Sequence, residues 1–163
     1  MAWVTPSNIT TNGPNLSSCT LTGASQIGNY IVGSNFSFAV STSVFLLGFQ
    51  VHANKTTPSP DISGQRQDDS IIIVVGASTS TDKSTGAQWN ATTDYGGPTD
   101  NWGLNGLRGA DLANLSVKMA PQSDSSSIGG GTVRITNMTL TVTYQFAPLT
   151  QLYNATIYAA TLR

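Results

Sequence analysis

Acid–base chemistry in this chain would have to rely on very few side chains. The sequence holds one histidine, His52, and eight acidic residues, all of them aspartate. A Ser-His-Asp or Cys-His site needs a histidine as its base, and His52 lies beside Gln50 on the polar side of an alternating segment, which indicates a surface histidine. Glycosidase chemistry needs two carboxylates that flank a sugar, and no aspartate here belongs to an organised motif. These residues predict a protein that is not an enzyme.

Metal and cofactor sites have equally little support. Cys19 is the single cysteine, so an internal disulfide and a cysteine pair for a metal are excluded. Asp94, Asp100 and Asp111 could supply oxygen ligands to calcium, but aspartates in loops usually accept hydrogen bonds from backbone groups of turns. Residues 129–131, three glycines, lack the lysine and the following helix of a phosphate-binding loop. We expect no metal and no cofactor.

Three aromatic side chains are the remaining candidates for a binding site. Trp89, Tyr95 and Trp102 lie within one polar stretch of the chain, where exposed rings could stack on sugars. The other interpretation is that these rings fill the ends of a hydrophobic core, because aromatic side chains bury a large area. Both interpretations remain open at this point.

Composition narrows the set of partners. Charged residues are 9% of the chain, compared with about a quarter in ordinary soluble proteins. The chain has no run of basic residues, which phosphate binding requires, so nucleic acid is not an expected partner. It also has no secretory signal at its start and no apolar run that could span a bilayer, so we expect synthesis in a cytoplasm and no membrane contact. A surface this poor in charge is either solvated by Ser, Thr and Asn or covered by other subunits.

The elements that would position these residues are strands. Glutamate is absent and lysine is rare, whereas Thr and Val are common, and this balance favours strands over helices. Alternation of polar and apolar residues predicts half-buried strands at residues 36–40, 45–53 and 115–119. The continuous apolar run at 71–75 predicts a strand buried on both faces. Residues 54–69 and 78–103 are loop-like in composition.

The longest alternating segment, residues 132–146, changes phase within itself. Met138, Leu140 and Val142 share one face, whereas Val133 and Ile135 lie in the opposite phase. A β-bulge near residues 136–137 would reconcile the two phases. One short helical turn is expected at Gly-Ala-Asp-Leu-Ala-Asn, residues 109–114.

Together these segments predict an all-β fold, one antiparallel β-sandwich that is jelly-roll-like and has extended N- and C-terminal arms. Residues 1–29 are expected to form the N-terminal arm, with one short strand at most, residues 30–146 the sandwich domain and residues 147–163 a tail strand. The tail is apolar on both sides, so we expect it to pair with a sheet of this chain or of another subunit. The residues expected at subunit contacts are Trp3, Leu152, Tyr153, Ile157, Tyr158 and Leu162.

The order of several motifs resembles a domain of structural proteins in phage virions. An early tryptophan at position 3 is followed by Pro-Ser-Asn at 6–8, Asn-Phe-Ser-Phe at 35–38 and Leu-Leu-Gly-Phe-Gln-Val at 46–51. Tyr-Gly-Gly-Pro-Thr-Asp-Asn-Trp-Gly at 95–103 is the most specific motif. Leu-Ala-Asn-Leu-Ser-Val at 112–117 and Ile-Thr-Asn-Met-Thr-Leu-Thr-Val-Thr-Tyr at 135–144 complete the series.

The resemblance implies a jelly-roll-like domain without catalytic activity, located in a virion. Because the domain fills nearly the whole chain, it is most similar to a separately encoded capsid cement or decoration protein. That similarity implies a homotrimer on the capsid surface that binds and stabilises the major capsid protein shell. The alternative is a receptor- or glycan-binding module of a tail tip, tail fibre or head fibre, with Trp89, Tyr95 and Trp102 as its contact residues.

Overall fold

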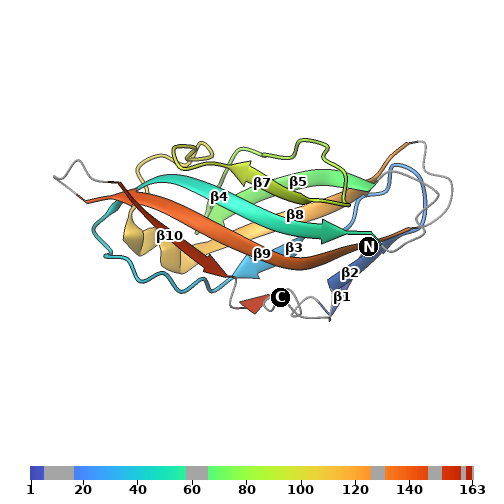
Figure 1. The fold of residues 1–163 in the computed structure, drawn as a ribbon, viewed down its shortest axis with the longest axis horizontal. Helices are drawn as coiled ribbons and strands as arrows, with labels where there is room; N and C mark the ends of the chain where they lie inside the picture. The colour runs from blue at the N-terminus through green and yellow to red at the C-terminus, as the bar shows by residue number, and fades with distance from the viewer. Residues whose placement is uncertain (6–16, 58–65, 126–130, 147–151, 159–160, 163) are drawn as a thin grey trace.

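The computed structural model describes residues 1–5, 17–57, 66–125, 131–146, 152–158 and 161–162, and in the last two segments only the backbone. The described strands form two sheets, and every pairing among them is antiparallel, so the predicted all-β sandwich is confirmed. Figure 1 shows β4 and β9 running along the molecule in front of β5 and β8. The jelly-roll topology stays a prediction.

The first sheet is built around two long strands. β9 pairs with β4 along one side, and along its other side it pairs first with β2 and then with β10. The strands of this six-stranded sheet are β1 (Trp3–Val4), β2 (Ser17–Leu21), β4 (Phe45–Thr56), β7 (Thr92–Gly96), β9 (Gly131–Gln145) and β10 (Leu152–Tyr158).

The second sheet packs behind the first. Its central strands are β8 and β5, and β6 and β11 lie at its edges in the strand order. The strands of this five-stranded sheet are β3 (Ile31–Ser34), β5 (Arg66–Val75), β6 (Ser78–Thr79), β8 (Leu115–Ser123) and β11 (Thr161–Leu162).

The bulge predicted in the long strand is present. Asn137 pairs with Asn54 and Ile135 pairs with Lys55, so Thr136 is the extra residue of β9. The Thr136 hydroxyl donates a hydrogen bond to the Asn54 carbonyl oxygen over 3.0 Å. Because the bulge reverses the phase of the strand, apolar side chains on both sides of it point into the core. These buried residues are Val133, Ile135, Met138, Leu140 and Val142.

The expectation that residues 71–75 are buried on both faces is wrong. Ile71 and Ile73 are fully buried, whereas Ile72 and Val74 are only half-buried. The described strands form two sheets, so β5 faces the first sheet on one side, and no described strand covers its other side. A continuous apolar run therefore did not distinguish a central strand of a sandwich from a strand covered on both faces.

Three other assignments are corrected by the structure. The stretch 54–69, loop-like in composition, includes the end of β4 and the start of β5. Residues 36–40 are not a strand, because after β3 the chain leaves the sheet at Asn35, whose φ of 58° is left-handed. The loop-like stretch 78–103 contains β6 and β7, and β7 pairs with β4 through Tyr95 and Val51.

The predicted helical turn is present as the 3-10 helix η2 (Gly109–Asn114). No helix in the described part of the chain has the length and apolar character needed to cross a membrane.

Both ends of the chain contribute strands to the sandwich. Residues 1–29 were expected to hold one short strand at most, but they contain two, β1 and β2, which pair with each other. β2 also pairs with β9, and its Cys19 and Leu21 are buried in the core. In the tail, β10 pairs with β9 of the first sheet and β11 pairs with β3 of the second. The tail therefore pairs with both sheets of its own chain (Figure 1).

Candidate functional site

The three aromatic residues considered for glycan binding are all in the core. Trp89 and Trp102 have 0% of their surface exposed, and Tyr95 has 2%. A ring that stacks on a sugar must present one face to solvent, and none of these three does so. Their positions correspond to the interpretation in which they fill the core.

The motif at 95–103 is a turn bonded to the neighbouring strand β4. Gly97 N–H and the Trp102 indole N–H both donate to the Phe49 carbonyl oxygen, over 3.0 and 2.8 Å. Phe49 N–H donates in return to the Asp100 carbonyl oxygen over 2.9 Å. A Cβ atom on Gly96 would collide with the Trp102 indole and with the Phe49 carbonyl. The glycine in this motif is therefore required by close packing of the turn.

Trp102 itself is held in a left-handed backbone conformation, with a φ of 56°. Its N–H donates to Asp100 Oδ1 over 2.9 Å, and its carbonyl oxygen accepts from Thr81 N–H and the Thr81 hydroxyl over 2.8 and 2.9 Å. Asp100 Oδ2 also lies 2.9 Å from Lys83 Nζ. Partial burial raises the pKa of Asp100, but the bonds from Lys83 and Trp102 outweigh burial and hold it below its usual value. These contacts stabilise a conformation that a tryptophan seldom adopts.

The chemically unusual part of the molecule is a buried polar cluster around Lys55. Lys55 Nζ donates to the Tyr95 hydroxyl over 2.6 Å and lies 3.4 Å from Asp68 Oδ1, and the side chains of Lys55 and Asp68 are completely buried. Asp68 Oδ2 accepts from Thr85 N–H over 2.8 Å. The ammonium group also lies 5.4 Å from the centre of the Trp89 ring and 5.2 Å from that of the Tyr95 ring. We call Lys55, Asp68, Tyr95 and Trp89 the lysine cluster.

Burial dominates the electrostatics of the lysine cluster. It lowers the pKa of Lys55, because the charged ammonium loses its hydration, while the negative charge of Asp68 acts in the opposite direction. Burial also raises the pKa of Tyr95, and the charge of Asp68 and a hydrogen bond to it raise that pKa further. Both residues are therefore shifted toward their neutral forms.

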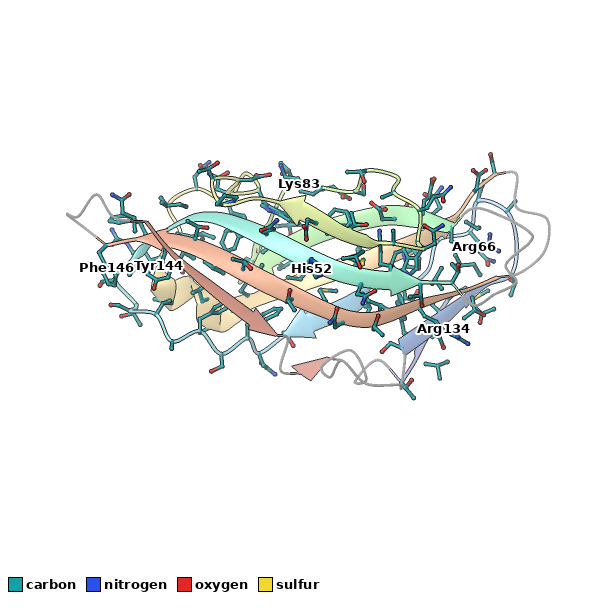
Figure 2. All side chains as sticks on the ribbon, in the orientation of Figure 1. His52, Arg66, Lys83, Arg134, Tyr144 and Phe146 are labelled. Atoms are coloured by element: carbon teal, nitrogen blue, oxygen red, sulfur yellow. The ribbon has the colours of Figure 1, made fainter. Side chains whose placement is uncertain are left out.

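Trp3, expected at a subunit contact, packs against this cluster within its own chain. Its ring centre lies 6.2 Å from that of Trp89, and its indole N–H donates to the Asn29 carbonyl oxygen over 2.8 Å. The Trp89 indole N–H donates to the Arg134 carbonyl oxygen over 2.8 Å. Figure 2 shows Arg134 and Arg66 at the end of the sandwich opposite Tyr144 and Phe146. One aromatic group therefore contains Trp3, which was predicted at a subunit contact, together with Trp89 and Tyr95, which were considered for glycan binding.

The other residues expected at subunit contacts lie in the tail strands. Leu152, Tyr153, Ile157 and Tyr158 are in β10, where they pair with residues 139–145 of β9, and Leu162 is in β11, paired with Gly33. Their backbones bind sheets of the same chain. Contact with another subunit through these residues stays a prediction.

The only histidine lies on the outer face of the first sheet (Figure 2). His52 Nδ1 is 2.6 Å from Asp94 Oδ1, and the two side chains are 44% and 54% exposed. His52 alternates with the buried Val51 and Ala53 along β4, as a surface histidine on a half-buried strand should. In the part of the chain that the structure describes, no group of three or more His, Cys, Asp or Glu is arranged to hold a metal.

Lys55 and Asp68 were missed because the sequence around them, residues 54–69, is polar and contains two prolines. A signal was nevertheless present. Phe49, Val51 and Ala53 alternate toward the core, and Lys55 is the next residue in that phase. A lysine that continues an inward-facing series should have an acidic partner on the opposite sheet, because an unpaired buried charge is very costly.

No protein-family model, curated protein or solved structure matches the chain.

Proposed function

We propose that this chain is a non-enzymatic structural protein of a phage virion, and that it acts as a capsid cement or decoration protein. Its partners are the major capsid protein and copies of itself, in a homotrimer on the capsid surface. Many copies that bind assembled shell, but not loose capsid subunits, stabilise the shell by mass action. The proposal is motivated by the motif at 95–103, which resembles a domain of structural proteins in phage virions. We propose in addition that the sandwich has a jelly-roll topology.

The observation that best supports the proposal is the outer face of the second sheet. Val32, Lys118 and Ile72 lie side by side in one row across β3, β8 and β5, and Ser34, Ser116 and Val74 form the next row. All six side chains are half-buried, and Lys118 is the single charged residue among them. Interfaces between proteins are depleted in charge at their centres. This face therefore suits contact with another protein surface.

The interior of the molecule supports the same proposal. The turn at 95–103 holds Trp102 in the core and binds β4, so this motif serves the scaffold and leaves no ring for a ligand. The alternative function, receptor or glycan binding at a tail tip, tail fibre or head fibre, would need residues other than Trp89, Tyr95 and Trp102.

Copy number in purified particles tests the proposal. Quantitative mass spectrometry should give hundreds of copies of this chain per particle, in a fixed ratio to the major capsid protein. Absence from the particle would refute the virion assignment. A few copies in multiples of three or six would refute the cement function and favour the receptor-binding alternative.

A further inference from the structure

The lysine cluster places an amine and a carboxyl group from opposite sheets next to each other. Lys55 is on β4 of the first sheet and Asp68 is on β5 of the second, and Nζ lies 3.4 Å from Oδ1. Both side chains are completely buried. Because two aromatic rings adjoin the ammonium group, water has little access to the space around it. We propose that Lys55 and Asp68 form an intramolecular amide bond that joins the two sheets covalently.

Burial favours the neutral forms of Lys55 and Asp68, which are the forms that react. A buried ion pair gains little stability, because the loss of hydration offsets much of the attraction between its charges. Transfer of one proton from the ammonium to the carboxylate gives a neutral amine and a neutral acid, which are the species that condense. The Tyr95 hydroxyl is 2.6 Å from Lys55 Nζ and is hydrogen-bonded to Asp68, so it can relay this proton.

Condensation then follows from the same contacts. The neutral Nζ attacks Cγ of Asp68, a C–N bond forms, and the carbonyl electron pair moves to Oδ2. Thr85 N–H, 2.8 Å from Oδ2, stabilises the negative charge that develops there. The Cγ–Oδ1 bond breaks, and Oδ1 leaves as water with one proton from the acid and one from the amine. The step consumes no other reactant, and the fold supplies the proximity that makes it an intramolecular reaction.

The consequence is a covalent link between the sheets that removes both buried charges. It forms in the isolated chain, so its test is independent of the proposed function in a virion. A chain of this kind would resist unfolding even where its noncovalent contacts are weakened, since a cross-link restricts the unfolded state.

Mass spectrometry of the full chain tests the proposal. The folded chain is sampled directly after purification and again after a week of incubation, and each sample is unfolded before its mass is measured. The expected intact mass is one water molecule lower than that of the linear chain. Trypsin should not cleave after Lys55, because acylated lysine is not a substrate, and a branched peptide should contain Lys55 and Asp68. An intact mass equal to that of the linear chain, with normal cleavage after Lys55, would overturn the proposal.

Variants assign the bond to these residues. Lys55→Arg and Asp68→Ala should each show the full mass of their own linear chains. Lys118→Arg is the matched control, because Lys118 is a half-buried lysine on β8 that faces outward, and it should keep the loss of one water. Tyr95→Phe should slow the loss of water. If Lys55→Arg fails to fold, the mass and cleavage pattern of the unaltered chain decide the question. A loss of water that persists in Lys55→Arg would also overturn the assignment.

Discussion

Lys55 shows how strongly one buried residue depends on its neighbours. The ammonium group has the Tyr95 hydroxyl, the Asp68 carboxylate and two aromatic rings around it, all from other parts of the chain. Before the amide bond forms, replacement of Lys55 or Asp68 alone would leave the other charge buried without its partner, which costs about 3–5 kcal/mol in known cases. The cluster therefore constrains how the two sheets pack against each other.

Gly96 tests the packing of the turn at 95–103. Gly96→Ala would place a methyl group against the Trp102 indole and the Phe49 carbonyl, at a backbone φ of 76° that disfavours side chains. We expect a loss of about 3 kcal/mol or more in the free energy of unfolding, measured by urea denaturation.

Gly97→Ala is the matched control for that variant. A Cβ atom on Gly97 would meet no other atom within 4 Å, and the backbone φ there is not left-handed. We therefore expect the free energy of unfolding of Gly97→Ala to change by about 0.5 kcal/mol or less. Equal losses in the two variants would show that the turn does not pack as described.

The lowered pKa of Asp100 predicts that the folded chain loses part of its stability in acid. Its pKa is lowered in the folded state, so its contribution to stability is fully present above the unfolded pKa of about 4 and is lost as the pH falls below that value. Because about a third of its side chain is exposed, we expect Asp100→Asn to cost about 1 kcal/mol at neutral pH. The variant should also lose less stability than the unaltered chain between neutral pH and about pH 3.

Urea denaturation at several pH values checks this expectation. Lys83→Gln removes the cation alone and should flatten the acid dependence only in part, because the hydrogen bond from Trp102 remains. Parallel pH profiles for the unaltered chain and Asp100→Asn would contradict the assignment.

At the scale of elements, β9 organises the first sheet. It is 15 residues long and pairs with β4 on one side and with β2 and β10 on the other. The tail strands cover backbone groups of both sheets, β10 on β9 and β11 on β3. Uncovered strand edges offer unpaired N–H and C=O groups to other chains.

Truncation after Phe146 tests the role of the tail. Removal of β10 and β11 exposes the paired edges of β9 and β3, so we expect self-association at lower concentration and reduced solubility. Light scattering and size-exclusion chromatography measure both effects. A chain that ends after Tyr158 keeps β10 and should associate less than the shorter one. If both truncated chains match the full chain in solubility and oligomeric state, the tail does not protect the sheets.

At the scale of the whole molecule, charge is scarce on the described outer faces. The outward residues of β3, β5 and β8 include the weakly apolar rows that contain Val32, Ile72 and Val74. The outward residues of β4 are mostly polar, as Gln50, His52 and Asn54 show. The two sides of the sandwich therefore differ in what they can bind.

Ile72→Lys tests the proposed contact with the shell. A second lysine next to Lys118 would place like charges on a face that we expect to be covered, so binding of the purified chain to particles that lack it should fall at least about tenfold. Gln50→Lys adds the same charge to the other sheet and should bind as the unaltered chain does. Co-sedimentation with particles measures both, and equal binding of the two variants would exclude this face as the contact.

Local sequence patterns determined much of the architecture. The alternation in residues 45–53, 115–119 and 132–146 predicted strands, and the change of phase near residues 136–137 predicted the bulge. Both predictions succeeded because side-chain direction in a strand depends on position along it. The turn at 109–114 was also predicted from a few adjacent residues. These features depend on short-range geometry, which the order of residues specifies directly.

Tertiary structure alone decided which buried side chains become neighbours and which segments of the chain meet. Lys55, Asp68 and Tyr95 are separated along the chain and become neighbours only when β4, β5 and β7 pack together. The same packing buried Trp89 and Trp102 and left the outer side of β5 half-exposed. Polarity indicates the average environment of a residue type, whereas the environment of one residue is set by long-range contacts that no local pattern contains.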